Sequence, residues 1–364
     1  MELRDLFHIV EERGASDLLI TAGAPPMIRV HGLMQAVDAP PLAPDEVKRM
    51  VYSLLNDKQK EEFEERKELD LSLGLGPTHR FRINCYIQRG CVAAAFRPIS
   101  SRIPGLKELG LPPIVYDLAF CPHGLILVTG PTGHGKSTTL ASMVDLINTN
   151  KRCHIITVED PIEFVHRNKQ SVIDQREVGG DTLSFPNALK YVLRQDPDVI
   201  LVGEMRDLET VAAALTAAET GHLVLATLHT NDAVQTIDRV IDVFPDRQQQ
   251  QVRVQLSLTL LSVISQRLLP KATGDGRVLA VEILRNTHSS ANLIREGKTH
   301  QLYSIIETGT KDGMVTLDAS LMKLYQRGLV TAEEAQRHMH NPQALIDFVL
   351  QEKPKQVPAA AAFK

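Results

Sequence analysis

The sequence is poor in the residues that mark secreted, zinc-binding and membrane-spanning proteins. It has no tryptophan, 4% aromatic residues and four cysteines, and no two cysteines have C-x-x-C spacing. We therefore expect reduced thiols in a reducing cytosol rather than a zinc knuckle or a disulfide framework. The N-terminus lacks a signal-peptide pattern, and no apolar run approaches the roughly 18 residues of a membrane helix. We expect a cytoplasmic protein that reaches a membrane only through a partner.

An excess of positive charge is also missing. The formal net charge is −4, with 23% charged and 43% hydrophobic residues, as in ordinary globular proteins. This balance argues against a nucleic-acid-binding protein, although a local basic patch would still be compatible with it. A chain of 364 residues is long enough for two domains.

The strongest positive signal lies at residues 124–140, which read GLILVTGPTGHGKSTTL. The order of apolar strand, glycine-rich loop and helix predicts a phosphate-binding P-loop, and this context disfavours an accidental glycine-rich turn. Loop amides and the positive helix end would hold the phosphates. Lys136 would reach the β- and γ-phosphates, and Ser137 would complete the shell of a Mg²⁺ ion. The expected binding residues for ATP are Gly130, Pro131, Thr132, Gly133, His134, Gly135, Lys136, Ser137 and Thr138.

The rest of the chain suggests an α/β organisation around this loop. Residues 1–98 predict a small α+β domain, which includes a long charged helix at 44–69 and later alternating strands. Residues 99–110 predict a linker, and residues 111–340 predict the nucleotide-binding domain with C-terminal helices. A long helix is expected over residues 246–269, because apolar residues recur along it. Residues 341–364 predict a terminal helix and a disordered tail.

Acidic residues follow two of the apolar strands expected after the P-loop. In an open α/β sheet, ligands collect beyond the carboxyl ends of the strands. Glu159, Asp160 and Glu163 are therefore candidates for contacts with metal-bound or catalytic water. Glu204 follows the next strand and is the candidate catalytic base, with a surface acid as the alternative. Gly203 occupies the place where a Walker B strand usually has its aspartate.

Two histidines flank the last of these apolar strands. His229 would follow its carboxyl end, where an imidazole can sense the γ-phosphate, and His222 would precede its amino end. For His229 the functional interpretation is favoured over a structural one, whereas for His222 the two are balanced. Neither histidine has a second ligand at i+4, so metal binding is not expected.

Three arginines of the first domain have two interpretations. Arg80, Arg82 and Arg97 fall on expected strands, and the favoured interpretation is that they face solvent. The alternative is that one of them reaches the nucleotide of a neighbouring subunit and stabilises charge on the γ-phosphate.

Several motifs, taken together and in order, resemble those of the secretion-ATPase superfamily, most of all its PilT-type branch, the pilus-retraction ATPases of type IV pili. They extend over residues 1–330 and comprise Gly14–Leu18, Pro25–Gly32, Gly130–Thr138, Glu159–His166, Gln175–Glu177, Leu193–Asp198, Gly203–Asp207 and Thr220–His229. The resemblance implies a PAS-like N-terminal domain, a RecA-like ATPase domain and a homo-hexamer with nucleotide between the domains. It also implies that Arg176 and Arg194 approach the phosphates. The expected partner is an inner-membrane pilus platform protein, with the ring in the cytoplasm at that membrane.

Two features bear on the branch of this superfamily. The extra N-terminal domain and four-cysteine insert of assembly-type relatives are not expected here, which favours retraction over pilus assembly or secretion. The retraction signature Ala-Ile-Arg-Asn-Leu-Ile-Arg-Glu appears as Ser289–Glu296, where Ala291 replaces the first arginine and Arg295 remains. An accessory paralogue of the PilU kind, working with a principal retraction motor, is therefore an alternative. A RecA-like nucleic-acid translocase is a third, disfavoured by the acidic charge.

Overall fold

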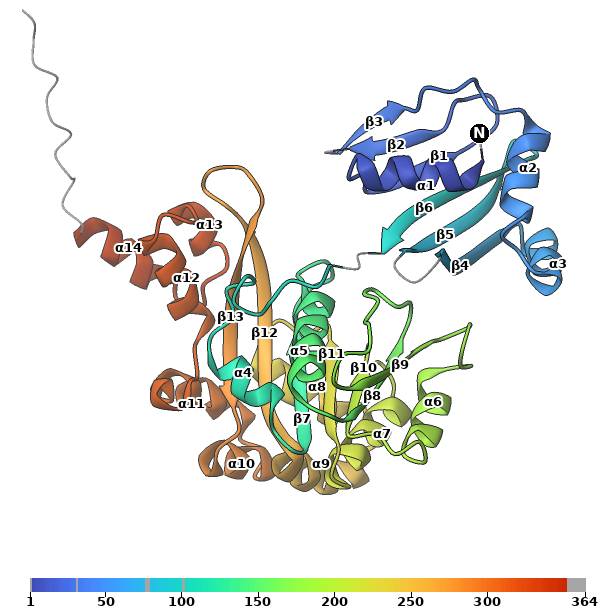
Figure 1. Cartoon of the computed structure of the whole chain (residues 1–364). Coiled ribbons are helices and arrows are strands. Elements are labelled where there is room, and N and C mark those ends of the chain that lie inside the picture. Colours follow the sequence, from blue (N-terminus) through green and yellow to red (C-terminus); the bar gives the residue numbers. More distant parts are fainter. Residues whose placement is uncertain (1, 31, 76–78, 100–101, 352–364) are drawn as a thin grey trace, which may run out of the picture. The chain divides into compact units, whose positions relative to one another are not determined.

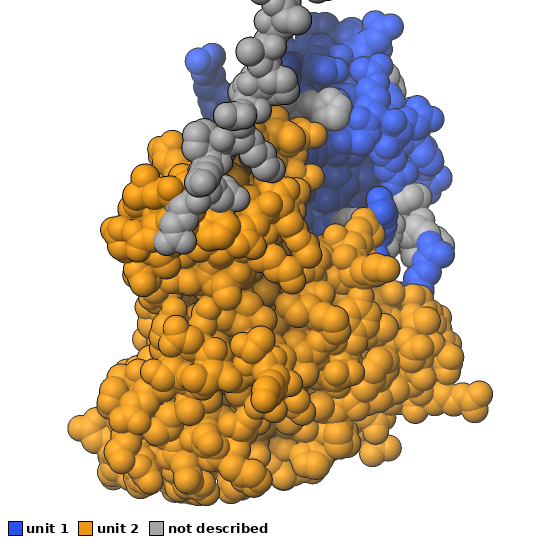
Figure 2. Space-filling model, turned by 90° about the vertical axis from the view of Figure 1, so that its left-hand side faces the viewer, with its two compact units in different colours: residues 1–103, 161–167 blue, residues 104–160, 168–364 orange. Residues whose placement is uncertain are grey.

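The structure is a computed structural model that describes residues 2–30, 32–75, 79–99 and 102–351 (Figure 1). It divides into two compact units, shown in blue and orange in Figure 2. The first unit contains Met1–Ile103 and Pro161–Arg167, and the second contains Pro104–Asp160 and Asn168–Lys364. Among the described residues, no helix combines the length and the apolar character that a bilayer crossing requires.

The first unit is an antiparallel six-stranded sheet with three helices, in the order β3-β2-β1-β6-β5-β4. Its core collects the apolar face of the first helix and the inward side of the central strands, including Phe7, Phe81 and Phe96. The elements are α1 (Leu3–Glu12), β1 (Asp17–Ile20), β2 (Met27–Val30), β3 (Leu33–Ala36), α2 (Pro44–Tyr52), α3 (Asp57–Arg66), β4 (Glu68–Leu75), β5 (His79–Gln88) and β6 (Cys91–Ile99).

The single helix expected at 44–69 is wrong, because two helices and the start of a strand occupy this range. Helix α2 ends at Tyr52, and Asn56 caps a new helix by accepting a hydrogen bond from the Gln59 amide. Lys67 then adopts a left-handed conformation with φ of 67°, which ends α3. A polar, highly charged segment does not reveal such a break, because solvent-facing residues show no apolar periodicity that the break could interrupt.

The second unit contains a seven-stranded sheet in the order β13-β12-β7-β11-β10-β8-β9. All neighbouring strands are parallel except β12 and β13, which pair antiparallel. Strands β7, β10 and β11 are buried along their whole length, as expected for parallel strands covered on both faces. The strands are β7 (Gly124–Thr129), β8 (His154–Glu159), β9 (Val172–Glu177), β10 (Val199–Val202), β11 (Leu223–Leu228), β12 (Leu260–Pro270) and β13 (Arg277–Arg285).

Helices cover this sheet, and further helices come after its last strand in the chain (Figure 1). One apolar cluster joins α6 to α9 with the sheet, and a second joins α4 and α5 with it. The covering helices are α4 (Ile114–Ala119), α5 (Lys136–Asn150), α6 (Phe185–Val192), α7 (Leu208–Glu219), α8 (Ala233–Asp242) and α9 (Asp246–Thr259). The helices that follow are α10 (His288–Arg295), α11 (Leu302–Thr308), α12 (Leu317–Gln326), α13 (Ala332–Gln336) and α14 (Pro342–Gln351).

The helix expected over 246–269 is also wrong in its second half. Helix α9 ends at Thr259, and Leu260 begins strand β12, which pairs with β7 on one side and β13 on the other. Val263 and Ile264 are fully buried in that strand. A short apolar run fits a buried strand as well as a buried helix, and here the long-range pairing decides between them.

Candidate nucleotide-binding site

The loop between β7 and α5 has a positive φ at each of its three glycines, Gly130, Gly133 and Gly135. Gly130 has φ of 138°, and a Cβ atom there would lie 2.3 Å from the carbonyl oxygen of Gln266 in β12. Gly135 has φ of 84° and caps α5, which begins at Lys136. The first amides of α5 therefore lie next to the glycine-rich loop. This strand–loop–helix arrangement is the phosphate-binding geometry that the sequence predicts.

The Lys136 side chain is folded back onto this loop. Its Nζ atom donates hydrogen bonds to the carbonyl oxygens of Gly130, at 2.8 Å, and Pro131, at 3.1 Å. The residue is only 7% exposed, and burial lowers the pKa of its ammonium group, while the charge of Glu204 opposes this shift. The ammonium group is held where an arriving phosphate would meet it. A phosphate oxygen can take the place of these carbonyl acceptors at small cost.

Glu204 and His229 join the ends of β10 and β11 to Lys136. His229 Nε2 lies 2.9 Å from Glu204 Oε1, and His229 Nδ1 lies 3.3 Å from Lys136 Nζ and from Thr132 Oγ1. His229 Nε2 can donate a hydrogen bond to the Glu204 carboxylate, and Nδ1 faces the Lys136 ammonium group. The segments after β10 and β11 and the first residue of α5 thus meet in one chain of contacts, Lys136–His229–Glu204.

The carboxyl group of Glu204 is held in its ionised form. Partial burial raises its pKa, but the hydrogen bond from Arg206 and the charges of His229 and Arg206 outweigh burial, so the pKa is lowered. Arg206 Nε lies 2.5 Å from Glu204 Oε1. An ionised carboxylate beside a P-loop can accept a proton from water.

The lack of space for a side chain explains why glycine, Gly203, occupies the Walker B position. Gly203 donates its backbone N–H to Val158 O at 2.8 Å. A Cβ atom on Gly203 would lie 3.2 Å from Glu159 Cα and 3.2 Å from Val158 O. The end of β10 therefore lies too close to β8 for the usual aspartate without some adjustment of the backbone.

The residues present fit a Mg²⁺ ion that the nucleotide brings with it. Within the described ranges, no group of three histidine, cysteine, aspartate or glutamate side chains could hold a metal. Ser137 is exposed in the first turn of α5, where its hydroxyl can supply one oxygen ligand. The remaining ligands would then be phosphate oxygens and water.

The acidic residues after β8 are divided between the two compact units. Glu159 lies at the end of the strand and accepts hydrogen bonds from Thr157 Oγ1, at 2.7 Å, and Gln175 Nε2, at 3.3 Å. Asp160 is exposed, and its charge acts on Arg206. Glu163 is exposed and belongs to the segment Pro161–Arg167 of the first unit. Asp160 therefore lies close enough to the Glu204–Arg206 ion pair to act on its charge. The role of Glu163 stays a prediction.

The other basic candidates are dispersed over the second unit. Arg176 in β9 donates from Nη2 to Asp181 O at 3.2 Å, while its buried Nη1 has no hydrogen-bond partner. Arg194 is exposed after α6. His222 precedes β11, at the end of the strand opposite to His229, so it does not join the P-loop contacts. Arg295 ends α10 and donates to Asn292 Oδ1 at 2.5 Å.

The three candidate arginines of the first unit lie on its strands, and two of them contact polar side chains of the same unit. Arg97 forms an ion pair with Asp17 at 2.9 Å, and Arg80 Nη2 donates to Ser72 Oγ at 2.6 Å. Arg82 is exposed and lies opposite Arg97 in the β5–β6 ladder. These positions suit strand arginines on a sheet surface, and a role in a neighbouring subunit stays a prediction.

Sequence reasoning missed several contacts between the P-loop and the β12–β13 hairpin. His134 Nδ1 accepts the Leu268 amide at 3.0 Å, and Arg277 Nη1 donates to Gly133 O at 3.2 Å. Burial, and then nearby cationic groups, lower the pKa of His134, so its ring is neutral and can accept. These partners lie more than a hundred residues along the chain, beyond any local pattern. Arg206, by contrast, stands two residues after Glu204 and could have been found.

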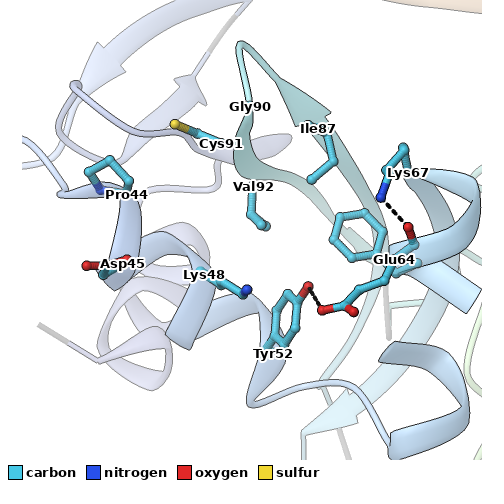
Figure 3. Close-up of a pocket in the computed structure, with 11 residues that line it drawn as sticks. Pro44, Asp45, Lys48, Tyr52, Glu64, Lys67, Ile87, Gly90, Cys91 and Val92 are labelled. Carbon is cyan, nitrogen blue, oxygen red and sulfur yellow. Dashed lines mark hydrogen bonds between the residues drawn. The ribbon is translucent and has the colours of Figure 1, made fainter. Parts of the chain in front are cut away.

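The first unit contains a separate cavity of about 350 Å³ between α2, α3 and the turn that joins β5 to β6 (Figure 3). None of its lining residues belongs to the P-loop. Tyr52 donates its hydroxyl to Glu64 Oε1 at 3.0 Å, and Lys67 donates to the Glu64 carbonyl. Polar groups of this cavity thus bond to one another within the first unit.

The sheet order, the glycine loop and the ionised glutamate define a P-loop nucleoside triphosphatase. A model of the type II/IV secretion system protein family matches residues 15–342. The chain belongs to this family, which confirms the resemblance seen in its motifs and the α/β fold with two units.

Two curated relatives and one solved structure give the similarity in detail. The type IV pilus retraction ATPase PilT of Pseudomonas aeruginosa is 50% identical over 343 residues, covering 94% of this chain and 99% of the relative. The type IV pilus ATPase PilU of the same organism is 43% identical over 338 residues, covering 93% and 88%. A crystal structure of the pilus retraction motor PilT with bound ADP superimposes with a TM-score of 0.89 at 50% identity, covering 95% of this chain and 99% of that one.

Proposed function

We propose that this chain is an ATP-hydrolysing motor that powers the retraction of type IV pili. The observation that carries the proposal is the Lys136–His229–Glu204 chain of contacts at the P-loop. Similarity to PilT over nearly the full length of both chains supports the retraction role.

Each residue of this chain of contacts has a distinct part in the proposed reaction. Lys136 exchanges its loop carbonyls for oxygens of the β- and γ-phosphates. Glu204 accepts a proton from the attacking water, and the bond between the γ-phosphorus and its bridging oxygen breaks to give ADP and phosphate. His229 orients the Glu204 carboxylate and links it to Lys136. Ser137, together with phosphate oxygens, would hold a Mg²⁺ ion, which would supply positive charge beside the phosphates.

The proposed assembly is a homo-hexamer in the cytoplasm. Its partner is an inner-membrane pilus platform protein, which the ring would turn as its subunits close on ATP and reopen. Arg176, Arg194 and the arginines of the first unit are candidates for contacts with a nucleotide at a subunit boundary. Nucleic acid has no part in this proposal.

An accessory role beside a principal retraction motor is a second candidate. Its support is Ala291, which replaces an arginine of the retraction signature, and the similarity to PilU. Ala291 lies in α10, which packs against α9, and Gln250 of α9 donates to the Arg295 carbonyl at 3.3 Å. The replacement therefore falls in a helix that packs against α9 and not in the P-loop. We expect it to change motor output rather than ATP binding.

ATP turnover by the purified full-length chain, measured together with its mass in solution, tests both candidates. We expect a hexamer that hydrolyses ATP without a partner and restores pilus retraction in cells that lack their own motor. A hexamer with negligible turnover, active only beside a second retraction ATPase, would support the accessory role instead. Turnover that depends on added DNA or RNA would contradict both.

A further inference from the structure

Three buried polar residues form a continuous line across the sheet beside the P-loop. Glu282 of β13 pairs with Ser265 of β12, and Ser265 pairs with Thr129 of β7. Residues in direct register point to the same face of a sheet. Each is at most 2% exposed, and Thr129 immediately precedes Gly130. We call Glu282, Ser265 and Thr129 the polar row.

The first turn of α8 is hydrogen-bonded to the polar row. Ala233, its first residue, donates its backbone N–H to Glu282 Oε1 at 2.9 Å. Thr236 Oγ1 lies 3.4 Å from Thr129 Oγ1, which lies 2.8 Å from Ser265 Oγ. Since His229 stands only four residues before Ala233, the polar row fixes the segment that carries His229.

Thr230 strengthens this connection. Its Oγ1 lies 2.7 Å from Thr236 Oγ1, so the residue directly after His229 is bonded to the same helix turn. A change in the position of α8 would therefore be passed to His229 through both the backbone and a side-chain hydrogen bond.

Glu282 also faces the C-terminal helices. The residues on either side of Glu282 bond to this region: the Val281 amide donates to Ser320 Oγ in α12 at 3.1 Å, and Ile283 and Val315 exchange backbone hydrogen bonds of 2.8 Å and 3.2 Å. Tyr303 and His340 lie nearby with their rings 5.3 Å apart, and burial, Asp318 and Glu282 raise the pKa of Tyr303 to about 12. The strand that carries Glu282 is thus hydrogen-bonded to the start of α12, and the Glu282 carboxyl group is hydrogen-bonded to the start of α8.

We propose that Glu282 is a positioning residue that ties the start of α12 to the start of α8 and thereby lets the C-terminal helices set the position of His229 against Glu204 and Lys136. The proposal rests on the proposed ATPase function only where turnover is the readout. Its chemical basis is the cost of leaving the Ala233 amide without an acceptor in a buried place. That cost falls on the turn which carries the His229 segment.

Substitution of Glu282 in the full-length protein tests this arrangement. Glu282→Met removes the acceptor at similar length, whereas Glu282→Gln keeps a carbonyl oxygen for the Ala233 amide. We expect Glu282→Met to lower kcat at least tenfold while KM for ATP and Kd for ADP change less than threefold. Glu282→Gln should stay within threefold of the unsubstituted chain in all three constants. Glu307→Met, on the exposed side of α11, is the matched control.

Amide hydrogen exchange separates this role from a general loss of stability and from failure of the proposed function. In the ADP-bound protein, Glu282→Met should speed exchange at residues 230–236 and 317–320 together, and elsewhere in the sheet exchange should not change. Thr236→Val, which leaves Glu282 intact, should speed exchange at 230–236 alone. These readouts hold even if the unsubstituted chain shows no turnover, an outcome that would contradict only the proposed function.

Two results would overturn the proposal. The first is unchanged kcat and unchanged exchange in Glu282→Met. The second is a loss of ADP binding as large as the loss of kcat, with exchange raised throughout the unit. If Glu282→Met does not fold, Glu282→Asp, whose shorter side chain reaches less far toward Ala233, should show the same paired increase in exchange. The absence of that increase would likewise contradict the proposal.

Discussion

The two histidines that flank strand β11 have the same chemistry and opposite surroundings. His222, before the strand, contacts the Ala217 carbonyl at 2.9 Å and the Thr220 hydroxyl at 3.2 Å through Nδ1. His229, after the strand, contacts Glu204 and Lys136, which lie on two other elements. The His222 ring contacts polar groups at the end of the neighbouring helix α7. The His229 ring contacts residues that lie far away in the sequence.

This difference extends to the two ends of the whole parallel sheet. At the amino end, His154 contacts the carbonyls of Gln195 and Asp196, and Asp198 accepts the His154 amide. At the carboxyl end, charged side chains contact one another beside the glycine-rich loop. Polar groups thus complete the fold at one end and remain able to exchange partners with a ligand at the other.

Removal of the base at the carboxyl end should give the largest effect. We expect Glu204→Gln to lower ATP turnover by about 100-fold or more, because the amide cannot accept a proton from water. Nucleotide affinity should change little, since Lys136 and the loop amides remain. Steady-state turnover and calorimetric binding of ADP check this. Glu209→Gln, an exposed acid at the start of α7, is the control, and normal turnover in Glu204→Gln would mean that another group is the base.

The substitutions His229→Asn and His222→Asn should have different effects on turnover and stability, because the two histidines lie at opposite ends of β11. Loss of His229 should reduce turnover by about 10-fold, because Glu204 loses the partner that orients it. Loss of His222 should leave turnover within about twofold and instead lower the free energy of unfolding by about 1 kcal/mol through a lost helix-end contact. Turnover and urea unfolding of both variants give the comparison. An equal loss of turnover in the two would contradict the assignment of ends.

The smallest effect is a pH dependence of stability at the amino end. Burial opposes the charged form of His154, but Asp174 and the nearby backbone carbonyls outweigh it and raise the pKa above 6.5. Its stabilisation is therefore complete below pH 6.5 and disappears as the pH rises through the raised pKa.

We expect His154→Gln to destabilise the chain by under about 1 kcal/mol near pH 5.5, and by less near pH 8.5, because the pair with Asp174 is partly exposed. Urea unfolding at both pH values measures the difference. A larger loss at the higher pH would show that the imidazole is not protonated in the folded chain.

How much the sequence predicts depends on how local each feature is. The P-loop is readable because its strand, glycines and helix are contiguous. Glu204 and His229 are readable because parallel strands align their carboxyl ends. Strand β12 is not, since its apolar run also fits a helix and only pairing with β7 and β13 decides. The contact of Glu282 is not predictable for the same reason, because its partner Ala233 lies in a helix 49 residues away along the chain.

The β12–β13 hairpin is held at one point by its contacts with the P-loop and extends beyond that point. Gly130 abuts Gln266, and the ring of His134 accepts the Leu268 amide. The ladder then continues to Pro270, so the hairpin, orange in Figure 1, extends about 13 Å beyond Gln266 at the rise of a strand. A small tilt at the phosphate loop would be enlarged at the hairpin tip in proportion to that length. The glycine-rich loop is thus hydrogen-bonded to an arm whose far end would move further than the loop itself in any rotation about these contacts.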